Sequence, residues 1–416
     1  MYGVNKTKRR TRYMTDNNFR RLPVGIQSFK VIREENYLYV DKSDIVWNLV
    51  NLGEKYNYLS RPRRFGKSVL VDTLESYLEG RKDLFEGLKI MQLEKDWKQY
   101  PVIRLDMSRG GANEETLRSY LNLRFKDYEE KYNITPDPTA MLADRFHAII
   151  ATAYKQSGLR VAVLIDEYDS PLQHSWRTPE QEKCTGVYRE VFAILKADDE
   201  YEQFVFITGI TKFTQISLFS VLNNLTNISF MPEYAAICGI TEEEIKENFM
   251  PELKQMSEVN NWSVQETHDR LKAYYDGYHF SRRNMVDVYN PYSLVNALKS
   301  KEIINFWASS GATSLLPKFV DNVELRLSNF ENIRIMRNTL ELSDVTGGGA
   351  ELFLYQSGYL TIKACDEFGY ILGFPNEEVM QALYEMVLPA LTLREKSDIQ
   401  SIQANLYAQL GTGEID

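Results

Sequence analysis

The sequence predicts an α/β protein in which a parallel sheet is flanked by helices and is followed by a mainly helical domain. From residue 20 to about 240, strand patterns alternate with helical patterns, which is typical of a parallel sheet with helices on both faces. The stretch VAVLI (161–165) is an unbroken apolar run, as expected of a strand that is covered on both faces. After Thr241 helical patterns dominate to about residue 310, which indicates a second domain.

Hydrophobic periodicity places the individual elements. We expect strands near residues 37–40, 56–60, 101–107, 160–166, 203–208 and 234–239. We expect helices near residues 44–52, 67–79, 114–131, 139–157, 180–197 and 217–225. The second domain opens on Thr241 with Glu244 three residues later, a capping box that begins a helix. Further on, YYDGYHFS (274–281) predicts a tight aromatic hairpin, used for packing or, as the alternative, for stacking on nucleic acid. TGGGA (346–350) predicts a hinge or loop, and the runs FLYQSGYLTIK and GYILGFP predict a short hairpin followed by helices.

A phosphate-binding loop is indicated by LSRPRRFGKS, residues 59–68. In such a loop, backbone N–H groups hold the β-phosphate, a lysine reaches the β- and γ-phosphate oxygens, and a hydroxyl ligates Mg²⁺. A strand pattern precedes the loop and a helix follows it, and a helix N-terminus favours anions. Arg61 stands where the pattern has its first glycine, so a solvated basic turn remains the alternative. The expected nucleotide contacts are Arg61, Pro62, Arg63, Arg64, Phe65, Gly66, Lys67, Ser68 and Val69.

Acidic residues follow the predicted strand near 160–166. Several apolar residues followed by Asp166 and Glu167 match the Walker B form, about 100 residues after the phosphate loop. We expect Asp166 to hold Mg²⁺ together with Ser68, and Glu167 to be the general base that orients the attacking water. The alternative is a strand that ends in a solvated acidic turn, because Asp169 follows closely.

A third strand, in EQFVFITGITKFTQ (202–215), turns polar at Thr208. In the P-loop class whose catalytic glutamate follows the Walker B aspartate, this strand lies between the other two and its polar tip senses the γ-phosphate. Thr208 is therefore the expected third catalytic residue, beside Glu167 and Lys67, and Lys212 and Gln215 are weaker candidates for the sensing role. A threonine that merely finishes a strand is the alternative.

Six separated blocks resemble, in order, the bacterial AAA-ATPase-like family, over roughly residues 20–415. The blocks are LPVGIQSFKVIREENYLYVDKS (22–43), YLSRPRRFGKS, PVIRLDMS (101–108), VLIDEYDSPL, ITGITKFTQISLFSVLNNLTNIS (207–229), and YYDGYHF with YNPYSLVNAL. The family writes its Walker A motif as R-P-R-R-F-G-K-S, so the resemblance implies that Arg61 belongs to an altered phosphate cradle. The motifs and the helical second half together give a P-loop NTPase core followed by a helical lid or winged-helix-like domain.

Four segments follow from these patterns: a flexible basic tail (1–19), a P-loop ATPase domain (20–240), a helical lid or winged-helix-like domain (241–345), and a lead-in segment (346–416). The resemblance implies that the last segment leads to a PD-(D/E)XK nuclease-like domain. No acid-x-Lys pair on adjoining strands is found after residue 350, so we expect that domain to be absent or truncated and assign no nuclease activity.

Composition fits a cytoplasmic protein. The 416 residues carry a net charge of −9, include three scattered cysteines, and contain no apolar stretch as long as a membrane helix. The overall charge does not favour nucleic-acid binding, although the basic residues of the first dozen positions could contact DNA backbone.

We therefore expect an ATP/ADP-binding protein, and a slow Mg²⁺-dependent ATPase that acts as a conformational switch, alone or with a protein partner or as a homo-oligomer. Arg282 and Arg283 are candidates for an arginine finger by position alone. Two alternatives remain open: a nucleotide-independent interaction scaffold, and an ATPase regulator of a DNA-processing nuclease domain that this chain lacks.

Overall fold

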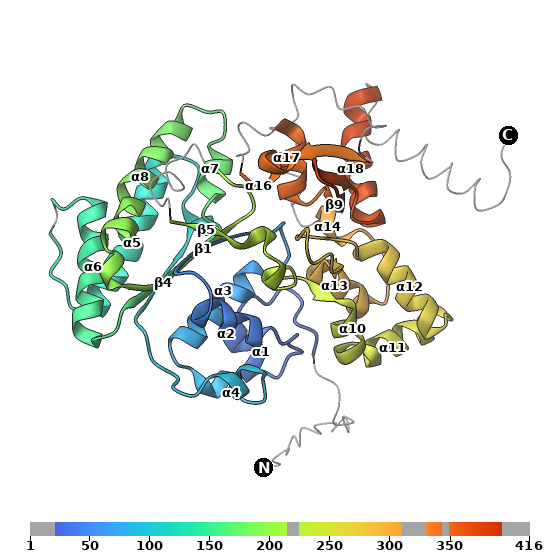
Figure 1. Cartoon of the computed structure of the whole chain (residues 1–416), viewed down its shortest axis with the longest axis horizontal. Coiled ribbons are helices and arrows are strands. Elements are labelled where there is room, and N and C mark those ends of the chain that lie inside the picture. The colour runs from blue at the N-terminus through green and yellow to red at the C-terminus, as the bar shows by residue number, and fades with distance from the viewer. Residues whose placement is uncertain are drawn as a thin grey trace, which may run out of the picture.

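The computed structural model describes residues 21–137, 139–213, 224–309, 330, 332–342 and 349–392, and the side chains of the last helix as far as residue 386. Within these ranges the strands form a five-stranded sheet, a three-stranded sheet and a two-stranded sheet. Figure 1 shows the strands of the large sheet in one half of the molecule, between two groups of helices, and strand β9 of the three-stranded sheet in the other half.

The five-stranded sheet is parallel throughout, with the order β2-β3-β4-β1-β5. Its strands are β1 (Tyr56–Ser60), β2 (Val102–Asp106), β3 (Val161–Asp166), β4 (Glu202–Gly209) and β5 (Thr226–Asn227). The prediction that the strand containing Thr208 lies between the other two motif strands is confirmed, because β4 pairs with β3 on one side and β1 on the other. The carboxyl ends of these three strands therefore meet at one edge.

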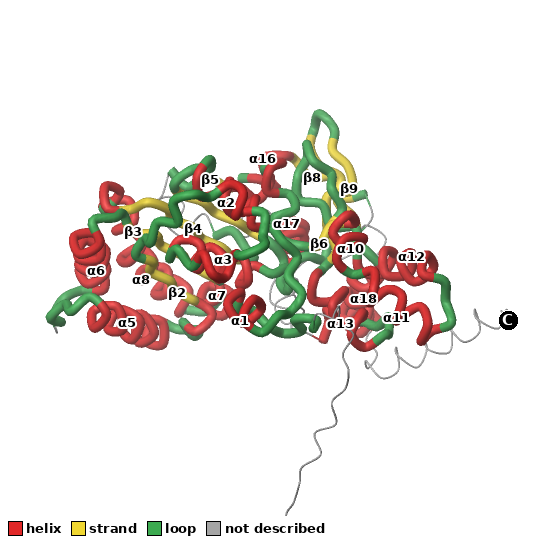
Figure 2. The backbone as a smooth tube through the Cα atoms, turned by 90° about the horizontal axis from the view of Figure 1, so that it is seen from below, coloured by secondary structure: helices red, strands yellow, loops and turns green. Residues whose placement is uncertain are grey.

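Helices cover both faces of this sheet, as predicted. One group comprises α1 (Phe29–Glu34), α2 (Ser43–Asn51), α3 (Lys67–Leu78) and α4 (Ile90–Leu93). The other comprises α5 (Glu114–Lys131), α6 (Leu142–Ser157) and α8 (Glu180–Ala197), which pack against one another, while the short α7 (Ser170–His174) follows β3. Figure 1 shows the two groups on opposite sides of the strands, and Figure 2 shows the same layers from below.

A second apolar core lies among the helices after residue 240. These helices are α10 (Glu242–Asn248), α11 (Met250–Asn260), α12 (Val264–Tyr275) and α13 (Pro291–Ser300), with the antiparallel pair β6 (Ile240–Thr241) and β7 (Val288–Tyr289) beside them. The predicted capping box is confirmed: the Thr241 hydroxyl accepts from the Glu244 N–H, and the Glu244 carboxylate accepts from the Thr241 N–H.

The C-terminal third packs on the core of the large sheet rather than forming a separate core. It contains α14 (Phe306–Ser309), β8 (Ile333–Met336), α16 (Arg337–Glu341), α17 (Gly349–Ser357), β9 (Thr361–Cys365), β10 (Gly369–Gly373) and α18 (Glu377–Thr392). The hairpin predicted here is confirmed as β9–β10, although FLYQS belongs to helix α17. Of the predicted TGGGA loop, only Gly349 and Ala350 are described, and they begin α17. The domain boundaries predicted above stay predictions.

Two predicted strands are wrong. Residues 37–40 form only one bridge, from Tyr37 to Arg21. They do not pair with the large sheet, because Tyr39 packs on the core of that sheet and Leu38 packs in the second apolar core. Residues 234–239 form turns, since the proline at 232 opens a 3-10 turn and Gly239 adopts a φ of +94°. The fifth position of the sheet is taken by β5 instead. The helix predicted near 217–225 lies largely outside the described residues.

Within the described part of the chain, no helix combines the length and the apolar character needed to cross a bilayer.

Candidate functional site

A cavity of about 470 Å³ opens at the carboxyl edge of the large sheet. The phosphate loop (residues 63–69) and Glu167 form one side of it. The N-terminal stretch 23–27, residues 237–240 and the start of α13 form the other side. The cavity thus lies where the five-stranded sheet meets the helices after residue 240, and parts of the chain that are far apart in the sequence form its walls.

The phosphate loop joins β1 to α3, as the sequence predicts. Gly66 caps α3 with a φ of +85°, and an added Cβ would meet no atom within 4 Å, so this glycine is needed for its backbone conformation rather than for space. Lys67 begins the helix, and its Nζ donates to the carbonyls of Arg61 at 3.0 Å and Pro62 at 2.9 Å. Burial lowers the pKa of Lys67, while Glu167 and Asp166 raise it.

Asp166 and Ser68 meet beside the loop. The Asp166 side chain is 2% exposed, and burial raises the pKa of its carboxyl, whereas a hydrogen bond from Ser68 lowers it. A carboxylate and a hydroxyl at one point are oxygen donors of the kind that Mg²⁺ takes beside nucleotide phosphates. The two residues therefore fit the Mg²⁺ site predicted from the sequence.

Glu167 lines the cavity from the end of β3. Its φ is +48°, an uncommon backbone conformation for glutamate, and its N–H donates to Oδ1 of Asp166 at 2.9 Å. Burial raises the pKa of its carboxyl, and the nearby Lys67 ammonium opposes that rise. Unusual backbone geometry and a shifted pKa in a cavity are features that gather at functional sites.

The structure does not bring Thr208 to the cavity. Its side chain is fully buried in β4, and its hydroxyl donates to the carbonyl of Leu59 at 2.9 Å. The hydroxyl therefore serves the sheet, which corrects the expectation that it senses a γ-phosphate. The Lys212 ammonium donates to the carbonyls of Glu341 and Leu342 in the C-terminal third, and Gln215 lies outside the described residues.

Arg61 also departs from its expected role. Its guanidinium is 1% exposed, donates to main-chain carbonyls, and lines a second, much smaller cavity together with Pro62. The side chain is thus not among those that line the large cavity. The expectation that Arg61 and Pro62 contact the nucleotide is therefore corrected, because Arg61 holds the loop to the carbonyls of Ser229 and Tyr234 on the side away from the large cavity.

The loop residues from Arg63 to Val69 do line the large cavity. The Arg63 guanidinium donates to Oε1 of Gln173 at 3.3 Å, and the exposed Arg64 lies over the Tyr292 ring at 4.8 Å. Phe65 is buried, so it supports the loop by packing, and Val69 belongs to the wall of the cavity. Neither Arg282 nor Arg283 is among the residues that line the cavity.

Asp169 is a positioning residue, although the sequence pattern indicated only a possible acidic turn at this position. Its buried Oδ2 accepts from the N–H groups of Ile210 and Thr211 and from the Thr211 hydroxyl. A Cβ on Gly209 would lie 2.4 Å from Oδ1 of Asp169, so glycine permits this close approach. Asp169 thereby fixes the end of β4 against the turn that holds Glu167.

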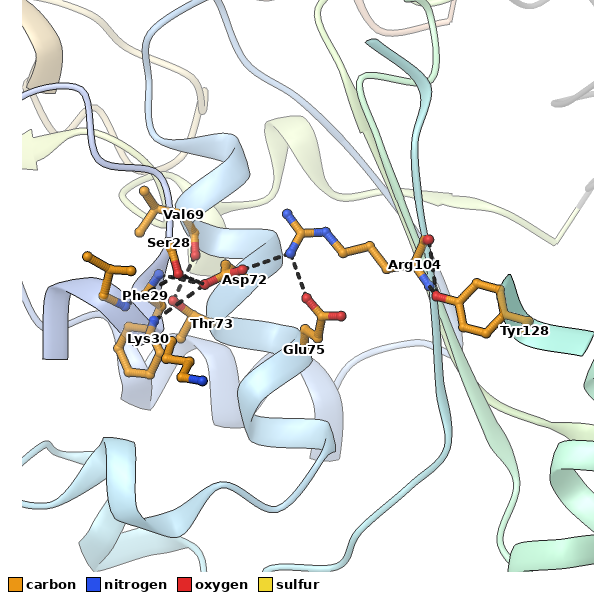
Figure 3. A network of polar contacts seen from close by, with 10 residues as sticks. Ser28, Phe29, Lys30, Val69, Asp72, Thr73, Glu75, Arg104 and Tyr128 are labelled. Atoms are coloured by element: carbon orange, nitrogen blue, oxygen red, sulfur yellow. Dashed lines mark hydrogen bonds and ion pairs between the residues drawn. The ribbon is translucent and has the colours of Figure 1, made fainter. Parts of the chain in front are cut away.

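Asp72 is a second positioning residue, and no motif signalled it. Figure 3 shows its carboxylate between helix α1 and strand β2. It accepts from the Phe29 N–H at 2.6 Å and the Ser28 hydroxyl at 3.1 Å, and it pairs with Arg104 at 2.8 Å. Since Asp72 belongs to α3, the helix that follows the phosphate loop also holds the start of α1, next to the stretch that lines the cavity.

The fold and the site define a protein of the P-loop ATPase class. The model of the family described as Predicted AAA-ATPase matches residues 23–219. An uncharacterized protein in the vnfD 5′ region of Azotobacter chroococcum mcd 1 is 32% identical over 398 residues, which cover 92% of this chain and 74% of that protein. The chain belongs to the AAA-ATPase-like family.

Solved structures give weaker likenesses. The Aeropyrum pernix ORC2 protein, in ADPNP–ADP complexes, is 12% identical with a TM-score of 0.33, over 91% of this chain and 98% of that chain. The Pyrobaculum aerophilum Cdc6p is 11% identical with a TM-score of 0.27, over 86% of this chain and 94% of that chain. Scores of this size do not establish a common architecture.

Proposed function

We propose that this protein binds Mg²⁺·ATP in the large cavity and hydrolyses it slowly, as a switch between two conformations. One observation carries the proposal: Lys67, Ser68 and Glu167, from two separate motifs, line a single cavity at the carboxyl edge of a parallel sheet, and the buried Asp166 contacts Ser68 beside it. A scaffold without a ligand needs none of these four groups in contact.

Each polar group has a definite task in this proposal. The Lys67 ammonium leaves the two loop carbonyls and neutralises the charge of the β- and γ-phosphates. Ser68 and Asp166 hold Mg²⁺, which supplies further charge neutralisation at the phosphates. Glu167 accepts a hydrogen bond from the attacking water and aligns it with the γ-phosphorus, while the loop N–H groups and the start of α3 hold the phosphates in place.

The remaining walls suit the base and sugar of a nucleotide. Ile26, Ile237 and Val295 are apolar, Asn296 is polar, and the Tyr292 ring lies near the charged loop. A cavity that is apolar at one end and cationic at the other matches the two ends of a nucleotide.

Thermal unfolding with and without Mg²⁺·ATP and Mg²⁺·ADP tests the proposal. A ligand present at a hundred times its dissociation constant stabilises the folded state by about 2.7 kcal/mol, so the melting temperature of the wild type should rise with either nucleotide. Lys67→Ala should abolish the rise. Lys196→Ala, which removes an exposed lysine of α8, is the matched control and should keep it.

The scaffold alternative predicts a different result. If neither nucleotide raises the melting temperature of the wild type at millimolar concentration, the proposal of a nucleotide site is wrong. If Lys67→Ala is stabilised as much as the wild type, nucleotide binds elsewhere than at the phosphate loop.

A further inference from the structure

Arg61 is a buried cation whose position the ATPase proposal does not use. Its guanidinium donates to the carbonyls of Ser60 at 2.8 Å, Ser229 at 2.9 Å and Tyr234 at 2.9 Å, and lies 4.1 Å from the centre of the Phe280 ring. Among the described residues, no carboxylate lies within ion-pair distance of it. Burial lowers its pKa to about 10. Because burying an unpaired charge is unfavourable, an apolar residue would stabilise this position better, unless the guanidinium serves a purpose.

The first half of the phosphate loop packs on segments from the second half of the chain. Phe65 meets the rings of Tyr278 and Phe280 edge to face, at centroid distances of 4.7 and 5.4 Å. A Cβ on Gly358 would lie 2.6 Å from Cβ of Pro62, so the backbone after α17 lies directly against the proline. The Tyr278 hydroxyl donates to the Gly358 carbonyl at 3.1 Å, which joins these two segments to each other.

Phosphate binding must disturb this packing. The Lys67 ammonium donates to the carbonyls of Arg61 and Pro62, the two residues whose side chains face the second half of the chain. When the ammonium turns to a phosphate, both carbonyls lose their donor in a buried place. Buried carbonyls without donors are unfavourable, so the loop backbone must adjust. The Arg61 side chain carries such an adjustment to Ser229, Tyr234 and Phe280. It also lines the small second cavity together with Tyr355 and Gln356 of α17.

We propose that Arg61 is the positioning residue that couples nucleotide occupancy of the phosphate loop to two segments: the aromatic hairpin (residues 275–289) and the α17–β9 segment (residues 349–365). The inference rests on the proposed nucleotide site and adds a route by which that site changes the C-terminal third. A glycine at position 61 would supply the ordinary loop without this connection, which gives the arginine in the altered motif a physical role.

Hydrogen exchange followed by mass spectrometry tests the coupling, with saturating Mg²⁺·ADP as the probe. In the wild type, Mg²⁺·ADP should change the exchange rates of both segments about fivefold or more, the lower end of coupling between linked sites. Arg61→Met keeps an unbranched apolar stem, although it is shorter than the arginine side chain, and removes the charge and the hydrogen bonds. It should bind Mg²⁺·ADP with an affinity within about tenfold of the wild type, while the response of the two segments is reduced; the contacts of Phe65 and Pro62 remain.

A second variant changes Phe280, the aromatic partner of the Arg61 guanidinium. Phe280→Leu leaves the sequence of the phosphate loop unchanged but removes the ring that lies beneath the guanidinium and meets Phe65, and it should weaken the same response. The double variant should add little to Arg61→Met, since both remove one connection. Phe280→Leu also keeps the proposal testable if Arg61→Met does not fold. Arg109→Met, at an exposed arginine whose side chain is 76% exposed, is the control and should respond as the wild type does.

The outcomes separate the two proposals. Failure of the wild type to bind Mg²⁺·ADP would refute the nucleotide site and the coupling with it. A wild type that binds Mg²⁺·ADP without a response in either segment would refute the coupling alone. So would a folded Arg61→Met variant that binds and responds like the wild type, or one that loses Mg²⁺·ADP binding, which would make Arg61 part of the binding cradle.

Discussion

At the scale of single residues, the site balances buried charges of opposite sign. Burial lowers the pKa of Lys67 and raises those of Asp166 and Glu167; the two carboxylates oppose the shift of Lys67, and the ammonium opposes the shifts of both carboxyl groups. Asp169 adds a further buried carboxylate, held by two backbone N–H groups. The charged groups therefore stay in place in a poorly solvated cavity, where electrostatic contacts with phosphate are stronger than in water.

The role of Glu167 gives a direct prediction. Glu167→Gln keeps the size of the side chain but cannot take a proton or align water as a carboxylate does. We expect ATP hydrolysis to fall by about a hundredfold or more, the usual contribution of a general base, while the affinity for Mg²⁺·ATP stays within about threefold. Steady-state phosphate release and a nucleotide titration measure the two effects.

Glu182→Gln is the control for this prediction, because Glu182 belongs to α8 and its side chain is 79% exposed. It should hydrolyse ATP at the wild-type rate. Unchanged turnover in Glu167→Gln would remove Glu167 from the catalytic role.

At the scale of elements, helix α3 connects the phosphate loop to the opposite wall of the cavity. Its first residues form the loop end, and one turn later Asp72 caps α1, whose preceding stretch 23–27 lines the cavity. Figure 3 shows that Arg104 of β2 lies between Asp72 and Glu75 of the same helix. One helix thus positions both the phosphate end and the N-terminal wall of the site.

Asp72→Ala should separate these walls. The hydrogen bonds to Ser28 and Phe29 and the ion pair with Arg104 are lost, so we expect the free energy of unfolding to fall by about 1–3 kcal/mol. Nucleotide affinity should fall as well, by about tenfold, because the stretch 23–27 loses its anchor. Urea unfolding and a nucleotide titration measure both quantities.

Glu75→Ala is the matched control for Asp72→Ala, since it removes the other ion pair of Arg104 and leaves the cap of α1 intact. It should lower stability without lowering nucleotide affinity. Equal losses of affinity in the two variants would show that Arg104, rather than the cap of α1, supports the site.

Element types followed from the sequence more reliably than side-chain contacts did. Periodicity located β1, β3, β4 and the long helices, because each has a continuous apolar pattern of its own. It predicted strands at residues 37–40 and 234–239, which do not pair in a sheet. Residues 38–40 line the cavity, and most of the stretch 234–239 forms turns and bends. Short apolar runs of this kind take their structure from their surroundings.

At the scale of the whole molecule, the C-terminal third shares the core of the large sheet, while α10–α13 enclose a core of their own. The buried carboxyl groups of the described residues include Asp276 at the end of α12, Glu378 in α18 and Glu202 in β4 of the large sheet. Burial raises the pKa of Asp276 to about 7, that of Glu378 to about 7, and that of Glu202 to about 8. Their unfolded values lie near 4.

These pKa values predict that stability falls as the pH rises. Between about pH 4 and pH 8 the folded protein holds more protons at these groups than the unfolded chain does, so the free energy of unfolding decreases toward higher pH. Asp276→Asn should therefore stabilise the protein at pH 8 by about 1–3 kcal/mol and change little at pH 5, as measured by urea unfolding at the two values.

The control for the pH prediction is Asp269→Asn, in the same helix at a side chain that is 62% exposed. It should not alter the pH dependence. Equal stability of the wild type and Asp276→Asn at pH 8 would show that Asp276 does not titrate in the expected range.

The sequence by itself determined the strands β1 to β4, the phosphate loop and the acidic pair, because each is a local pattern whose chemistry depends on neighbouring residues. Only the tertiary structure decided where Arg61, Thr208 and Asp72 point. Arg61 donates to residue 234, Thr208 to residue 59, and Asp72 accepts from residue 29, so their partners lie far away along the chain. The direction and burial of a side chain depend on such distant contacts, which a local sequence pattern does not specify.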